Sequence, residues 1–214
     1  MARRSSGPAA PRIGAPDLPA DLGIADLAPR ADLLQAQVAG DTGPHARLTE
    51  CILSGDAGDR LDLTGATLVD VEIEALRVTT FSARGARWRR TRMRGGRIGT
   101  LDLADAELDE VELRGIRIDY LSLASARVVD LRIADCRIGA MDLPRATLTR
   151  VALPGTVVDE LDARELRSED LDLRGAELSS VTDPASLRGA TISEAQAHEL
   201  APLLAAALGL RLED

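Results

Sequence analysis

A five-residue periodicity runs without interruption from Leu61 to Ser180 and constrains the fold more than any other feature of the sequence. The middle residue of each pentapeptide is hydrophobic at 23 of 24 positions, and the residue two places before it is hydrophobic at 21 of 24. The exceptions are Ser168 in the first column and Thr91, Gly96 and Thr156 in the second. Neither a helix of period 3.6 nor a strand of period 2 keeps a fixed five-residue phase. The pattern therefore predicts a solenoid of short repeated units.

Each pentapeptide fits a short extended segment followed by a sharp two-residue corner. Side chains of an extended chain alternate between two faces, so an inward, outward, inward triplet places both hydrophobic columns on one side. Glycine recurs at the last position of the unit, and Pro154-Gly155 matches the centre of a type II turn. The sequence therefore predicts a chain that turns every five residues and buries two columns of side chains.

Segments such as Leu61-Asp62-Leu63 and Ala106-Glu107-Leu108 resemble the pentapeptide-repeat family, whose loose consensus is Ala-(Asp/Asn)-Leu-x-x. The resemblance implies an all-β solenoid, a right-handed quadrilateral β-helix in which four pentapeptides make one coil of twenty residues. Residues twenty apart would then be vertical neighbours. Six coils at about 4.8 Å each would make a regular shaft roughly 29 Å long.

The two ends of the chain differ from the repeat. Residues 1–16 are rich in Ser, Pro, Ala and Arg, and we expect a disordered tail there. We expect an N-terminal lead-in or cap over 17–45, with one short helix through 31–38, then the β-helix over 46–182 and a C-terminal cap over 183–214. Ser193 and Gln196 match a capping box that opens a helix in this cap, and Gly209 is placed to end it.

The predicted terminal helix carries an apolar stripe that suits two roles. Its members are Leu200, Leu203, Leu204 and Leu208. The stripe can close the open end of the last coil, or it can mediate a homodimer, and the sequence leaves both roles open.

Composition limits the partners. The net charge is −9 and the chain contains no lysine, so we expect no direct binding of nucleic acid. The N-terminal arginines are followed by neither an apolar signal region nor a stretch long enough to span a membrane. We therefore expect a cytoplasmic protein. Cys51 and Cys136 fall on inward positions about four coils apart, too far for a disulfide.

Motifs that could carry chemistry are sparse. His45 and His198 are the only histidines, and neither has Ser or Cys at the spacing of a nucleophile and its base. The sequence has no phosphate loop and no zinc-binding motif, and its regularly spaced carboxylates lack the flanking ligands of a metal site. We therefore expect a non-enzymatic binding protein with no catalytic residues, no metal and no cofactor.

Arginine is concentrated in the coil spanning 81–100, which contains no acidic residue. The cluster comprises Arg84, Arg87, Arg89, Arg90, Arg92, Arg94 and Arg97. Alone it suggests a polyanion site, but the coils on either side are acidic. In the predicted register Arg90 neighbours Asp70, and Arg92 neighbours Glu112. Opposite charges at cross-strand distance stabilise a sheet, so this register favours a ladder of ion pairs over a binding patch.

Two outward columns do not alternate in sign. The predicted acidic stripe consists of Asp62, Asp102, Asp142 and Asp162, interleaved with Ser82 and Ser122. The predicted basic stripe consists of Arg77, Arg97, Arg117 and Arg137. Each stripe could contact a protein of opposite charge.

The family resemblance gives the acidic stripe a functional meaning. Some members that protect bacterial DNA gyrase from fluoroquinolones are thought to imitate the DNA duplex, and this chain resembles the compact loop-free actinobacterial type. The resemblance implies a regulator of gyrase, a type II topoisomerase, with the acidic stripe on the enzyme's DNA-binding saddle. A 29 Å length of B-DNA holds roughly 17 negative charges, whereas the six coils sum to −4. Imitation of DNA would therefore involve only one face of the solenoid.

The alternative is a general interaction scaffold that uses the basic stripe or other charged faces.

Overall fold

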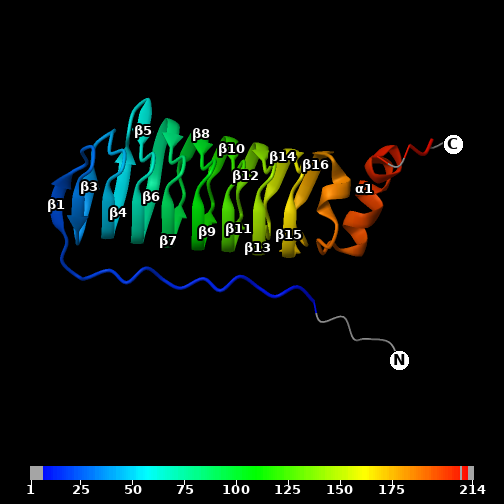
Figure 1. Ribbon diagram of the computed structural model, residues 1–214, viewed down its shortest axis with the longest axis horizontal. Helices are drawn as coiled ribbons and strands as arrows, with labels where there is room; N and C mark the ends of the chain where they lie inside the picture. Colours follow the sequence, from blue (N-terminus) through cyan, green and yellow to red (C-terminus); the bar gives the residue numbers. More distant parts are fainter. Residues whose placement is uncertain (1–6, 208, 212–214) are drawn as a thin grey trace.

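The computed structural model describes residues 7–207 and 209–211, which form an elongated parallel β-solenoid closed by a C-terminal helix (Figure 1). Within these residues, sixteen strands belong to one sheet that winds around the shaft. The elements are β1 (Gly23–Asp26), β2 (Asp32–Leu34), β3 (Ala36–Ala39), β4 (Arg47–Asp56), β5 (Arg60–Asp62), β6 (Thr67–Ser82), β7 (Arg87–Arg94), β8 (Arg97–Asp102), β9 (Glu107–Arg114), β10 (Arg117–Ser122), β11 (Arg127–Ala134), β12 (Arg137–Asp142), β13 (Thr147–Ala152), β14 (Val157–Asp162), β15 (Arg167–Asp172), β16 (Glu177–Thr182), the 3-10 helix η1 (Pro184–Leu187) and the α-helix α1 (Glu194–Ala207). The predicted solenoid is confirmed.

Successive coils stack with an offset of twenty residues. Arg87 of β7 pairs with Glu107 of β9, which in turn pairs with Arg127 of β11. From β7 onward each coil contributes two strands, so that β7, β9, β11, β13 and β15 stack on one another and β8, β10, β12, β14 and β16 do the same. Four pentapeptides therefore make one four-sided coil, as the sequence predicts.

The N-terminal coils are narrower than the rest, and the helix predicted over 31–38 is wrong. The offset between paired residues is 13 from β1 to β3 and 15 from β3 to β4, and it reaches 20 only from β4 to β6. The segment 31–38 instead forms β2 and β3, separated by Gln35 at a positive φ of 52°. The edge of β4 exposes unpaired backbone groups, and pairing with them outweighs a helical pattern only two turns long.

Three of the four corners of each regular coil contain a residue in the left-handed region. In the coil spanning 101–120 these residues are Asp105, Glu110 and Gly115, with φ between 55° and 64°. Glycine occupies some of these positions, as predicted, but Asp, Glu, Arg and Ala occupy others. Left-handed φ strains a residue that has a Cβ, so the fold tolerates that strain at many corners.

We expect Gly115→Ala to lower the free energy of unfolding by about 1 kcal/mol. Gly115 has φ 64°, and an added Cβ would meet no atom within 4 Å, so the loss would come from the backbone alone. Ala75, forty residues earlier at the same corner, has φ 48° and is exposed. The matched change Ala75→Gly should not destabilise the protein. Urea unfolding of both variants measures the difference, and equal losses would contradict this account of the corners.

The interior of the shaft is filled by the two predicted columns, including their polar exceptions. Phe81 and Trp88 lie in one coil with ring centroids 5.9 Å apart. Gly96 of that coil has no space for a side chain, because a Cβ would lie 2.2 Å from the Leu76 carbonyl oxygen. Thr156 is fully buried, and its hydroxyl donates to the Ile133 carbonyl at 3.0 Å. Gly96 and Thr156 are therefore compatible with a closed interior, whereas the buried Ser168 hydroxyl has no hydrogen-bond partner among the described residues.

The C-terminal helix closes the last coil, and the predicted capping box is confirmed. The Ser193 backbone N–H donates to Gln196 Oε1 at 2.7 Å, and the Gln196 N–H donates to Ser193 Oγ at 3.2 Å. The Gln196 amide also donates to the carbonyls of Leu173 and Ala176 at 2.6 and 2.7 Å. This buried side chain therefore caps both its own helix and the open end of the sheet.

The N-terminal segment lies along the outside of the shaft. Residues 7–22 leave β1 and run back past the coils in an extended conformation, toward the C-terminal half (Figure 1). Three backbone N–H groups of this segment donate to side chains of the shaft, over 53 to 118 positions in sequence. Where we expected a disordered tail, residues 7–16 thus have a defined path; residues 1–6 lie outside the described part.

Candidate binding surfaces

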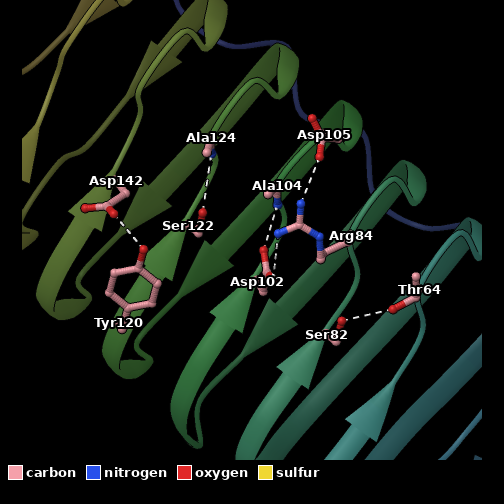
Figure 2. Close-up of polar contacts among 10 residues, drawn as sticks. All are labelled: Thr64, Ser82, Arg84, Asp102, Ala104, Asp105, Tyr120, Ser122, Ala124 and Asp142. Atoms are coloured by element: carbon pink, nitrogen blue, oxygen red, sulfur yellow. Dashed lines mark hydrogen bonds and ion pairs between the residues drawn. The ribbon is translucent and has the colours of Figure 1, made fainter.

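The aspartates of the predicted acidic stripe lie in one straight column. In register order its members are Asp62, Ser82, Asp102, Ser122, Asp142 and Asp162. We call this set the acidic column. Each member pairs directly with the one in the next coil, and Figure 2 shows the side chains from Ser82 to Asp142. The stack therefore presents its polar groups at the spacing of strands, about 4.8 Å.

Most members of the acidic column also close the turn that follows them. Oδ1 of Asp102 accepts a hydrogen bond from the backbone N–H of Ala104 at 3.0 Å (Figure 2). Equivalent bonds of 3.0 Å join Asp62 to Thr64 and Asp162 to Arg164. Asp142 differs, because residue 144 is proline and has no N–H to donate. The aspartates thus have a structural role in the turns, which Asp142 does not share.

Arginine side chains neutralise three of the four aspartates. The distances are 3.1 Å for Arg60 to Asp62, 3.3 Å for Arg84 to Asp102, and 2.9 Å from Arg164 Nε to Asp162. The hydrogen bond from Arg164 holds the pKa of Asp162 below its usual range. These arginines are more than half exposed, and exposed ion pairs contribute only about 0–1 kcal/mol. A strongly basic surface could therefore displace them.

Asp142 is the aspartate of the column that forms no ion pair or hydrogen bond with an arginine among the described residues, and Arg164 of the next coil acts on it only through its charge. Its Oδ2 accepts a hydrogen bond of 2.6 Å from the hydroxyl of Tyr120 (Figure 2). This hydrogen bond raises the pKa of Tyr120. Tyr120 is partly exposed. Since neither a turn nor an ion pair requires the Asp142 charge, it is the aspartate of the acidic column most available to a partner.

We expect the two roles of Asp162 to separate in a pair of variants. Asp162→Asn keeps an oxygen that can accept the Arg164 N–H but loses the exposed ion pair, so the free energy of unfolding should change by no more than about 1 kcal/mol. Asp162→Ala also removes the turn hydrogen bond and should cost about 1 kcal/mol more. Urea unfolding at neutral pH measures both. Equal destabilisation by Asn and Ala would mean that the charge, and not the turn, is what matters.

The predicted basic stripe is also in register. Arg77, Arg97, Arg117 and Arg137 stack as direct neighbours on β6, β8, β10 and β12. Two counter-charges that were not predicted, Asp119 and Asp159, lie beside these arginines. Asp119 lies 3.4 Å from Arg97 and 3.6 Å from Arg117, and Asp159 lies 3.9 Å from Arg137. Asp119 is two residues after Arg117, and Asp159 is two residues after Val157, the residue that pairs with Arg137 in the next coil. Following this outward position through all coils, and not only after the arginines, could have revealed both.

A shallow groove of about 700 Å³ borders the basic stripe. Arg77, Arg97 and Asp119 line it together with Gly96 and Gly99. Arg97 is 61% exposed even though it is paired with Asp119. The groove therefore combines open space with cationic groups that an acidic partner could reach.

The arginine cluster of coil 81–100 forms the predicted ladder with its neighbours. Arg87 lies 3.1 Å from Glu107, Arg89 3.7 Å from Asp109 and Arg92 3.6 Å from Glu112. Arg90 makes two hydrogen bonds to Asp70 in the coil below, and these hold the pKa of Asp70 below its usual range. The acids of the adjacent coils thus compensate much of the positive charge, which argues against a polyanion site.

The leucines assigned to the cap or to a dimer divide into two groups. Leu200 is buried, and Leu203 packs against the solenoid core. Leu204 is 36% exposed. Leu208 lies outside the described residues. Capping therefore uses Leu200 and Leu203, and Leu204 is the residue that a homodimer contact could use.

The remaining reactive side chains do not converge on a site. Cys51 and Cys136 are buried free thiols, and burial raises the pKa of each. His198 is exposed on α1, with Nδ1 2.8 Å from the Glu194 carbonyl oxygen. Over 7–207 and 209–211, no group of three His, Cys, Asp or Glu side chains is arranged to hold a metal ion. In the same ranges, no helix is long and apolar enough to cross a membrane.

The five-residue repeat and the twenty-residue coil define the class of fold: this chain is a parallel β-solenoid built from five-residue units. No protein-family model and no curated protein matches the sequence. Among solved structures, a trypsin-treated variant of QnrB1, a plasmid-mediated fluoroquinolone resistance protein, aligns over 88% of this chain and 95% of its own, with 15% identity and a TM-score of 0.36. HetL, a pentapeptide-repeat protein involved in the regulation of heterocyst differentiation in the cyanobacterium Nostoc, aligns over 75% and 86%, with 15% identity and a TM-score of 0.25.

Proposed function

We propose that the chain is a non-enzymatic binding protein whose acidic column docks on the basic DNA-binding surface of a type II topoisomerase such as DNA gyrase. Binding there would regulate the enzyme or protect it, and would place the protein in the cytoplasm. The observation that carries the proposal is Asp142, whose carboxylate serves neither a turn nor an ion pair with arginine among the described residues. It lies in a straight column of evenly spaced polar groups, a form that complements an extended basic groove.

Charge supports a local contact rather than imitation of DNA along the whole rod. The net charge of −4 over the six coils is far below the roughly 17 charges of an equal length of duplex. Arginines at Asp62, Asp102 and Asp162 lower the negative potential further. The contact should therefore centre on Asp142, with the other three aspartates contributing as their exposed arginines move aside.

A supercoiling assay with purified DNA gyrase tests this proposal. We expect the protein to inhibit supercoiling, or to relieve quinolone poisoning, at micromolar concentration. Asp142→Arg should weaken the effect at least tenfold, about 1.4 kcal/mol, without destabilising the shaft. The matched control Arg117→Glu, on the basic stripe, should leave the effect unchanged. No effect of the unmodified protein would reject a topoisomerase partner.

The groove beside the basic stripe supports a second candidate, a scaffold that binds an acidic protein. Arg77 and Arg97 line this groove, and like charges stacked at strand spacing are destabilising unless a ligand or nearby acid compensates them. The two candidates make opposite predictions for the same pair of variants. Loss of partner capture by Arg117→Glu, with Asp142→Arg unaffected, would favour the scaffold.

A further inference from the structure

The N-terminal segment follows one corner of the shaft, away from both stripes. We call residues 7–19 the strap. The corner it covers carries one residue from each coil, and these are Asp70, Arg90, Glu110, Asp130, Arg150 and Asp170. The strap runs antiparallel to the direction in which the coils are added, so its earlier residues meet the later coils (Figure 1).

Backbone N–H groups of the strap donate to carboxylates of this corner. The bonds are Arg12 to Asp130 Oδ1 at 2.8 Å, Gly14 to Glu110 Oε2 at 3.2 Å, and Asp17 to Asp70 Oδ1 at 3.1 Å. Two extended residues advance about 6.6 Å and three about 10 Å, while one coil is about 4.8 Å and two are about 9.6 Å. The step from Gly14 to Asp17 therefore matches the two coils that it spans, whereas the step from Arg12 to Gly14 exceeds its single coil by about 2 Å.

Two of the acceptors are held in place by the shaft itself. Asp70 and Asp130 are 5% and 4% exposed, and each is held by the arginine twenty residues later, Arg90 or Arg150. The Arg150 guanidinium donates one hydrogen bond to each carboxylate oxygen of Asp130, and both bonds are 2.7 Å long. These fixed carboxylates direct an oxygen toward the strap, and such preorganised acceptors need no rearrangement to bind an N–H.

The strap is suited to an exposed, extended path. It contains Pro8, Pro11, Pro16 and Pro19, which restrict φ and carry no N–H. The strap is bonded to the shaft through its backbone, and its side chains at positions 12, 15 and 17 are exposed. Ile13 and Leu18 are only partly buried. The shaft thus recognises an extended backbone mainly through its spaced N–H groups, and the charges of Arg12 and Asp17 add attraction to Asp130 and Arg90.

We propose that this corner is a recognition site for an extended, proline-containing peptide segment, and that the strap is its intramolecular occupant. A partner segment of the same kind would displace the strap and bind the same carboxylates. The site is separate from the acidic column and the basic stripe, so it does not depend on the function proposed above.

A pair of full-length variants tests the proposal. Arg12→Pro combined with Gly14→Pro removes two donors, and a Cβ at position 14 would also lie 2.8 Å from Glu110 Oε2. Ala15→Pro is the control, because among the described residues the N–H of Ala15 makes no hydrogen bond. The probe is a fluorescent synthetic peptide of residues 7–22, and binding is followed by anisotropy.

We expect the peptide to bind the double variant up to about a hundredfold more tightly than the unmodified protein or Ala15→Pro, about tenfold for each hydrogen bond removed from the competing strap. Adding Glu110→Ala to the double variant should then weaken peptide binding about tenfold. Hydrogen exchange at the Asp17 amide, which donates to Asp70, should be faster in the double variant, with thermal unfolding of the shaft unchanged. Equal peptide affinity for all three proteins, or an Asp17 amide that exchanges no faster, would overturn the proposal.

Discussion

The twenty-residue register between parallel coils is the constraint on which the rest of the structure depends. Hydrogen bonds between coils fix each residue above the one twenty positions earlier. Residues that recur every twenty positions in the sequence therefore form a column in the structure. The same register fills the interior with two apolar columns, aligns Asp70 with Arg90 as an ion pair, and spaces the acceptors that the strap meets. The surfaces are therefore consequences of the coil length rather than separate features.

The regular shaft could be predicted from sequence because its two inward columns keep one phase for 120 residues. The capping box of Ser193 and Gln196 could also be predicted from sequence, since its two residues are close together in the chain. The strands β1 to β3 could not be predicted, because coils of 13 and 15 residues break the five-residue phase. The strap could not be predicted for another reason. It contacts the shaft through backbone N–H groups, which leave no pattern of side chains.

The charged surfaces could be located but not interpreted from sequence alone. The sequence predicts the same acidic stripe at Asp102 and Asp142. In the structure Asp102 closes a turn and forms an ion pair with Arg84. Asp142 instead accepts a hydrogen bond only from Tyr120 among the described residues. Pro144 is the local signal for that difference, since it has no N–H for the turn. A repeat thus gives each coil the same positions, and a single departure from the consensus, such as Pro144, frees a side chain from its structural role.

Distances between spin labels placed in one column test the register most directly. Arg47, Arg87 and Arg167 are exposed and lie in the same column, while Cys51 and Cys136 are buried with raised pKa values and should label slowly. In the double variant Arg87→Cys and Arg167→Cys, the labels lie four coils apart, and pulsed electron paramagnetic resonance should give a separation of about 19 Å. In the pair Arg47→Cys and Arg167→Cys it should give about 29 Å, six coils. Two distances that do not differ by about 10 Å would contradict the stacked columns and every surface derived from them.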